Sequence, residues 1–140
     1  MAGNSVVDMQ HARIRSILGK KCKRNRENAG RYLHYLQKAL VRPCRLTGRE
    51  DFPWEKDCLK KGWASSAYQE MRKEQPSFLD QFELLELLPL PPEGLEVMAR
   101  VRRIEDRKHF EIELQWLECV EFKNENYQLL DDYTSWAADY

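Results

Sequence analysis

Two kinds of hydrophobic spacing divide the chain, with helical spacing at both ends and strand spacing in the middle. Residues 28–40 place apolar side chains three and four positions apart, which predicts an amphipathic helix. Because Arg42 precedes Pro43, it is biased out of the helical conformation, and the helix is expected to end by residue 42. A weaker helical pattern over residues 6–18, which includes Val6 and Met9, stops at Gly19, a common C-terminal breaker.

After residue 77 the hydrophobic period changes to two, which predicts β-strands. Residues 82–88 form a candidate buried strand, and residues 95–104 and 109–117 alternate apolar and polar positions around a turn at 105–108. We therefore expect an antiparallel hairpin with opposite charges across its outer face, which contribute roughly 0.2–1 kcal/mol per pair. The expected cross-strand pairs involve Arg100, Arg102, Glu111 and Glu113. These pairs explain the charges without a ligand.

The stretch between the first helices and the hairpin has weaker patterns. Residues 43–46 predict a short strand closed by Thr47 and Gly48, and residues 49–63 show no sustained period and predict a long loop. Long loops often carry function. Residues 64–74 predict a short helix that ends before a proline, with an inward face formed by Ala67, Tyr68 and Met71.

The last fifteen residues predict a helix that the aromatic side chains anchor to the core. One face is formed by Leu129, Tyr133, Trp136, Ala137 and Tyr140, and the other by Asp131, Asp132, Ser135 and Asp139. Burying large apolar side chains contributes roughly 1.5–3 kcal/mol each, enough to order a chain end. Asp131 and Asp132 are expected near the positive N-terminal end of this helix.

These elements predict an α+β fold with N-terminal helices, a small antiparallel β-sheet or partly open SH3-like barrel, and a docked C-terminal helix. At 140 residues the chain fits a single domain with its own core. The expected divisions are a basic helix or arm (1–27), an aromatic helix (28–42), strands (43–122) interrupted by a loop and helix insertion (49–77), and the C-terminal helix (126–140).

Composition predicts the cellular location of the protein and the state of its cysteines. The chain shows neither a secretory apolar run nor a stretch long enough to span a membrane, so we expect a cytoplasmic protein without a membrane partner. Its four cysteines include no C-x-x-C pair and are interpreted as buried thiols, with a disulfide or a zinc site as the alternatives. They are Cys22, Cys44, Cys58 and Cys119.

The net charge of zero conceals two opposite parts. Residues 1–48 carry eleven Lys and Arg against two acids, and residues 49–140 carry twelve against twenty-one. Either the basic part packs on the acidic remainder, or it meets an anionic partner such as nucleic acid or an acidic protein. The residues of the second alternative are Lys20, Lys21, Lys23, Arg24 and Arg26.

Candidate chemistry is limited to oxygen ligands for a cation. The three histidines are far apart and no catalytic motif is present, so we expect no enzymatic activity. Two acidic clusters could supply the carboxylates that Ca²⁺ prefers, although neither matches an EF-hand, and solvated acids are the simpler alternative. The clusters are Glu50, Asp51, Glu55 and Asp57, and Glu125, Asn126, Asp131, Asp132 and Asp139.

Three segments of the chain resemble the small bacterial calcium-binding proteins first known from cyanobacteria. They are RYLHYLQKALVRPCRL (31–46), EDRKHFEIELQWLE (105–118) and DDYTSWA (131–137). The chain departs from that family in an extra stretch from about residue 49 to 78 and in having Cys44 where an aromatic residue is usual.

The resemblance implies a helical-plus-barrel fold and a small non-enzymatic protein that binds Ca²⁺ as a buffer or sensor. Asp131 and Asp132 are proposed ligands because they match the terminal motif, and Asp51 and Asp57 are proposed from local acid density. The alternative function is an interaction module that uses the basic N-terminal arm.

Overall fold

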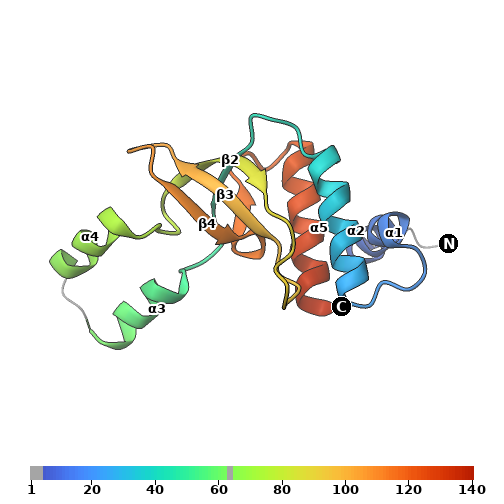
Figure 1. The fold of residues 1–140 in the computed structure, drawn as a ribbon, viewed down its shortest axis with the longest axis horizontal. Helices are drawn as coiled ribbons and strands as arrows, with labels where there is room; N and C mark the ends of the chain where they lie inside the picture. Colours follow the sequence, from blue (N-terminus) through green and yellow to red (C-terminus); the bar gives the residue numbers. More distant parts are fainter. Residues whose placement is uncertain (1–4, 63–64) are drawn as a thin grey trace.

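The computed structural model describes residues 5–62 and 65–140, and within them the chain forms five α-helices, one 3₁₀ turn and a five-stranded sheet (Figure 1). The helices are α1 (Val6–Leu18), α2 (Arg26–Ala39), α3 (Pro53–Lys60), α4 (Ser65–Glu74) and α5 (Glu125–Asp139). The strands are β1 (Arg45–Gly48), β2 (Gln81–Leu87), β3 (Met98–Arg103), β4 (His109–Glu113) and β5 (Leu117–Cys119). The predicted α+β class is confirmed, with an open antiparallel sheet. In the described chain, no helix has both the length and the apolarity of a membrane span.

The sheet has the order β4-β3-β2-β1-β5, and all neighbours are antiparallel. Arg100 lies opposite Glu111 and forms the predicted ion pair at 3.5 Å. Arg102 does not lie across from either predicted glutamate: it is opposite His109 and pairs instead with Glu83 of β2 at 2.6 Å. Alternation fixes which face a side chain takes, but a shift of two residues preserves the face and changes the partner.

Helices α2 and α5 lie side by side next to the sheet, and α1 packs on their far side (Figure 1). The aromatic anchors predicted from the sequence meet in this layer, where the ring of Tyr32 lies 5.2 Å from those of Tyr133 and Trp136. The indole N–H of Trp136 donates to the carbonyl of Cys22 at 2.7 Å. Burial and hydrogen bonding therefore fix the C-terminal helix against the core.

The C-terminal helix differs from its prediction in phase and in start. It begins at Glu125, so Asp131 and Asp132 lie in its middle and not near its N-terminal end. Asp132 is buried, although the sequence pattern placed it on the solvent face. Leu130 takes a fully buried position, while Leu129 is only partly buried. The reason is that α1 covers this side of α5 and supplies Asp132 with a cationic partner.

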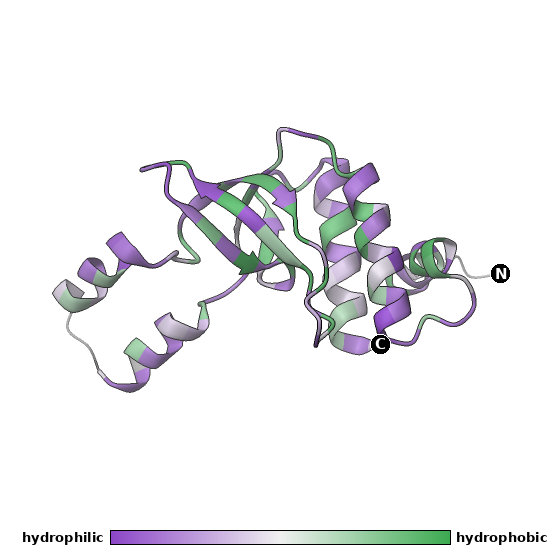
Figure 2. Cartoon of the chain, in the orientation of Figure 1, coloured by the Kyte–Doolittle hydropathy of each residue, from purple (hydrophilic) through white to green (hydrophobic). Residues whose placement is uncertain are grey.

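The segment between β1 and β2 contains two helices that extend away from the sheet (Figure 1). The prediction of a loop over 49–63 is wrong, because α3 occupies residues 53–60 of it. A helix of eight residues is too short to show a clear period. Helix α4 confirms the predicted helix, although its predicted start at Ala64 lies outside the described residues. Figure 2 shows that both helices are largely polar, and Ala67 is exposed because no layer covers α4.

Helix α1 ends where the sequence predicted. Gly19 takes a positive φ of 86°, and its N–H donates to the carbonyl of Arg15 at 2.7 Å, which closes the helix. The predicted inward positions Val6 and Met9 are exposed, because the first turn of α1 extends beyond its neighbours and only Ile14 and Leu18 are buried in this helix.

The cysteines are free and buried, as predicted. Burial raises the pKa of the Cys44 thiol to about 12, so this thiol is a structural group in the core.

Candidate functional site

A pocket of about 340 Å³ lies between the β1–α3 connection and α5. Its walls come from three separate parts of the chain, and the lining residues are Arg49, Glu50, Asp51, Pro53, Lys56, Gln115, Trp116 and Thr134. The pocket combines two carboxylates with two cations beside a single tryptophan ring. Its lining includes no histidine or cysteine.

Pairing of β1 with β5 brings these walls together. Gly48 lies opposite Leu117, and the N–H of Arg49 donates to the carbonyl of Trp116 at 2.9 Å. Gly48 is required here for space, since a Cβ at this position would lie 2.5 Å from the backbone of Phe78. Gly48 therefore lets the end of β1 pass close to Phe78, and the next residues, Arg49 to Asp51, line the pocket.

Arg49 is the fixed cation of the pocket. Its Nε donates to the carbonyl of Leu117 at 3.0 Å, and its Nη1 lies 3.4 Å from Oδ1 of Asp131. Its Nη2 is buried and has no hydrogen-bond partner in the described chain. The same holds for Oγ1 of Thr134, which lies one turn after Asp131 on α5. Buried polar atoms without partners are uncommon and indicate a place where a polar ligand or water can bind.

The two lining carboxylates have different surroundings. Glu50 accepts from Nζ of Lys56 at 3.2 Å, and both side chains are more than half exposed. The carboxylate of Asp51 has no hydrogen bond or ion pair with any described residue, and Asp51 is partly buried. Asp51 is therefore the lining acid whose oxygens are available without breaking a contact.

The four predicted metal ligands have three different environments. Asp51 and Asp131, eighty positions apart, both lie close to Arg49, which the sequence alone could not show. Asp132 is buried, and its oxygens accept from Nε and Nη2 of Arg13 at 2.7 and 3.0 Å. Asp57 is exposed on α3.

The predicted aspartates do not gather into one cluster. Among residues 5–62 and 65–140, no three His, Cys, Asp or Glu side chains come together in a group that could hold a metal ion. Asp131 and Asp132 share the amide of Gln10, which donates to them at 3.4 and 3.0 Å. Asp132 thus serves the contact between α1 and α5, and Asp51 and Asp131 are the predicted ligands near the pocket.

Glu55, which belongs to the first acidic cluster, has a structural position. It is 1% exposed and accepts hydrogen bonds from the backbone N–H groups of Phe52 and Phe78. The hydroxyls of Ser77 and Tyr68 also donate to it. A carboxylate with four donors has no lone pairs left for a ligand.

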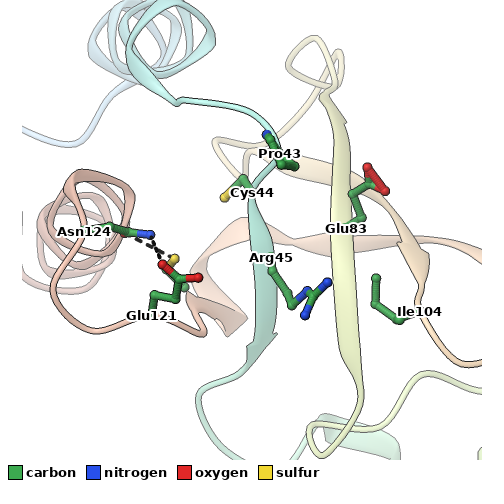
Figure 3. Close-up of a pocket in the computed structure, with 8 residues that line it drawn as sticks. Pro43, Cys44, Arg45, Glu83, Ile104, Glu121 and Asn124 are labelled. Atoms are coloured by element: carbon green, nitrogen blue, oxygen red, sulfur yellow. Dashed lines mark hydrogen bonds between the residues drawn. The ribbon is translucent and has the colours of Figure 1, made fainter.

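A second pocket, of about 320 Å³, lies beside β1 and the start of α5 (Figure 3). Its charged groups are already paired or diverge: Glu83 pairs with Arg102, while Arg45 and Glu121 point to different sides of β1 in Figure 3. Asn124 caps α5 by accepting from the N–H of Tyr127 at 2.9 Å. This pocket therefore offers no converging set of ligands.

The structure separates the five predicted basic residues into two groups. Lys20, Lys21 and Lys23 are exposed and make no ion pair with any described residue. Arg24 lies 4.0 Å from Glu96, and Arg26 donates to the carbonyls of Pro91 and Gly94 at 2.8 and 3.3 Å. The two arginines are therefore engaged within the fold.

Arg49, Lys56, Gln115 and Thr134 were not identified as site residues from the sequence. They are ordinary polar residues in segments without a motif, and only the contact between β1, the 3₁₀ turn and α5 brings them together. The one available signal was the acid density at residues 50–57.

Comparison with known proteins identifies the fold. No family model matches the chain, and no curated protein matches it by sequence. Two solved structures align with 99% of this chain and 96% of their own: the crystal structure of Anabaena CcbP (TM-score 0.62) and a calcium-binding protein in its calcium-binding form (TM-score 0.61). The chain has the fold of these two proteins.

The sequence identity to each is 17%, so the predicted resemblance is remote, and it is confirmed at the level of fold. The alignments span nearly the whole chain and therefore extend across residues 49–78, the stretch that was expected from the sequence to be an addition to the family.

Proposed function

We propose that this protein binds Ca²⁺ without catalysing a reaction, as a buffer or a sensor in the cytoplasm. The observation that carries the proposal is the full-length structural likeness to a protein described in a calcium-binding form. Because fold alone does not determine function, the local chemistry of a site must also suit the ion. The predicted ligand Asp51 lines the Arg49 pocket, and Arg49 itself pairs with a second predicted ligand, Asp131, at 3.4 Å.

The pocket contains oxygen donors of the type that Ca²⁺ takes, although the described acids form no ready-made group of three. Ca²⁺ takes about six to eight oxygen ligands, from carboxylates, amides, hydroxyls, carbonyls and water. Glu50, Asp51, Gln115 and Thr134 supply oxygens in the lining, and Asp131 adds a carboxylate beside Arg49. The unpartnered Oγ1 of Thr134 is consistent with a ligand on this side of the pocket. Bound Ca²⁺ would neutralise the carboxylates and connect the β1–α3 segment to α5.

Asp51 gives the most direct test of the site. In Asp51→Asn, isothermal titration should show Ca²⁺ binding weakened about tenfold, since a charged oxygen ligand is replaced by a neutral one. Asp139→Asn, an exposed acid at the end of α5, is the matched control and should bind like the wild type. Equal affinity of the two variants would place the site elsewhere, and no binding by the wild type at millimolar Ca²⁺ would end the proposal.

The exposed lysines support a second candidate function, binding of an anionic partner such as nucleic acid or an acidic protein. Lys20, Lys21 and Lys23 lie within four residues, are exposed, and make no ion pair with any acid of the described chain. Replacing all three by Gln should abolish retention on immobilised single-stranded DNA at low salt and leave the fold unchanged. Retention equal to that of the wild type would remove this candidate.

A further inference from the structure

Strand β4 forms one edge of the sheet, because in the described chain it pairs with β3 on one side only (Figure 1). The N–H of Arg103 donates to the carbonyl of Lys108 at 2.8 Å, which marks a bonded pair next to the turn. Bonded pairs alternate in an antiparallel ladder, so the backbone groups of Phe110 and Ile112 also face β3. The residues between them direct their N–H and C=O groups away from the sheet, and they are His109, Glu111 and Glu113.

These outward backbone groups have no backbone partner in the described chain. The groups of an edge strand bond to water or to another extended chain. Many proteins protect such an edge with a proline, a lysine, a bulge or a very short strand. β4 has five residues without proline or lysine, and its register with β3 is continuous. The edge therefore has the regular geometry that a further strand requires.

Acids outnumber cations on the solvent face of this edge. Glu111 lies 3.5 Å from Arg100, and Arg100 also pairs with Glu86 of β2 at 2.7 Å, so two acids share one cation. Glu113 is partly buried and forms no ion pair with any described residue. An added strand would bring its own side chains beside both β4 glutamates, where lysine or arginine would supply the missing positive charge.

The environment of Glu113 supports this need for a cation. Burial and the nearby carboxylate of Glu96 raise the pKa of Glu113, and the more distant cation of Arg24 opposes them only in part. On the other face of β4, Phe110 is partly buried, so an apolar side chain of an added strand could cover the rest of its ring. Cations and apolar residues would then alternate along the partner.

We infer that β4 binds an extended segment of another protein, which pairs with it as an antiparallel sixth strand and carries lysine or arginine at alternate positions. The backbone groups of β4 determine that the partner is a strand, and Glu111 and Glu113 determine its charge. A second copy of β4 fits less well, because antiparallel pairing centred on Glu111 would place two identical carboxylates opposite each other. This inference is independent of the calcium function.

The charge requirement is tested with a labelled peptide of about seven residues, close to the usual length of a strand, in which lysine and valine alternate. Fluorescence polarisation at low salt should show saturable binding by the wild type. Glu111→Gln and Glu113→Gln should each weaken binding about two- to fivefold, because each removes one cross-strand charge pair. Glu121→Gln, an exposed acid that follows β5 at the opposite edge, is the matched control and should bind like the wild type.

The backbone requirement is tested on the wild-type protein with two methylated forms of this peptide. In an antiparallel pair, the lysines beside the outward residues of β4 are the ones whose N–H groups face β4. Methylation of the lysine backbone nitrogens should therefore abolish binding. Methylation of the valine backbone nitrogens, which face solvent in the complex, should leave it within about twofold of the unmodified peptide.

Amide hydrogen exchange, followed by NMR, locates the peptide on the strand. In the free protein, the three outward amides of β4 should exchange faster than those of Phe110 and Ile112, and the peptide should slow them. The inference is wrong if the wild type does not bind the peptide at millimolar concentration, if both methylated peptides behave alike, or if the outward amides gain no protection. Protection that grows with protein concentration in the absence of peptide would identify a second copy as the partner and would also overturn it.

Discussion

At the scale of single residues, the structure assigns different roles to acids that look equivalent in the sequence. Glu55 and Asp51 lie four positions apart, yet Glu55 is buried with four donors, while Asp51 has no partner among the described residues. Acid density identified this segment, but burial and hydrogen bonding, which depend on distant residues such as Ser77, decide which acid is free. The sequence therefore identified the segment that lines the pocket, but it could not show that Asp51 is free and Glu55 is fully hydrogen-bonded.

Glu55→Gln should destabilise the fold by about 2 kcal/mol, because the amide would direct an N–H group at donors and leave them unpaired in the interior. Urea unfolding measures this difference, and Glu50→Gln, an exposed acid, is the control with little expected change. An unfolding midpoint equal to that of the control would mean that Glu55 does not hold α3, α4 and Ser77 together.

The Arg103–Asp106 pair predicts a defined pH dependence. The guanidinium of Arg103 donates to both oxygens of Asp106, at 3.0 and 2.8 Å, and lowers the pKa of Asp106 to about 2. The ordinary pKa of Asp is about 3.9, so the stabilisation is complete above about pH 4 and is lost as the pH falls towards 2. Between pH 5 and 2, the melting temperature of the wild type should therefore fall more than that of Asp106→Asn. Parallel curves would contradict this assignment.

At the scale of elements, strongly periodic segments were predictable and short ones were not. The helix at 28–40 and the hairpin around the turn at 105–108 match α2, β3 and β4. In contrast, the sequence reads as one strand from 109 to 117, but the chain turns at Leu114–Trp116 and begins β5, which pairs with β1. The three residues of β5 are too few to show an alternating pattern, and their pairing depends on β1, about seventy residues earlier.

The contact that holds α1 on α5 can also be tested. Arg13 holds the buried Asp132 of α5 through two hydrogen bonds, and only two apolar side chains of α1 are buried. Arg13→Gln should lower stability by about 2 kcal/mol, since a buried carboxylate loses its counter-charge and Arg13 is itself about one-third exposed. Hydrogen exchange should become faster over α1 than over the strands. Unchanged protection of α1 would show that its apolar contacts suffice.

At the scale of the whole molecule, the opposite charges of the two parts meet within the fold. Arg13 pairs with Asp132 and Arg24 with Glu96, so the basic N-terminal segment packs on the acidic remainder, one of the two interpretations left open by the sequence. The exposed lysines at positions 20, 21 and 23 remain available for the other interpretation, contact with an anionic partner. The order of elements and the fold likeness could be predicted from the sequence. The pairing of Arg49 with Asp131 could not, because it depends on tertiary contacts.

The most direct test of the account is a ¹H–¹⁵N NMR titration of the wild-type protein with Ca²⁺. If Ca²⁺ binds in the Arg49 pocket, saturable shifts should occur at the backbone amides of Glu50, Asp51 and Thr134 and at the indole N–H of Trp116, all of which line that pocket. The indole of Trp136, buried in the helical layer, should shift little. Shifts that gather in another part of the molecule, or none at millimolar Ca²⁺, would contradict the account.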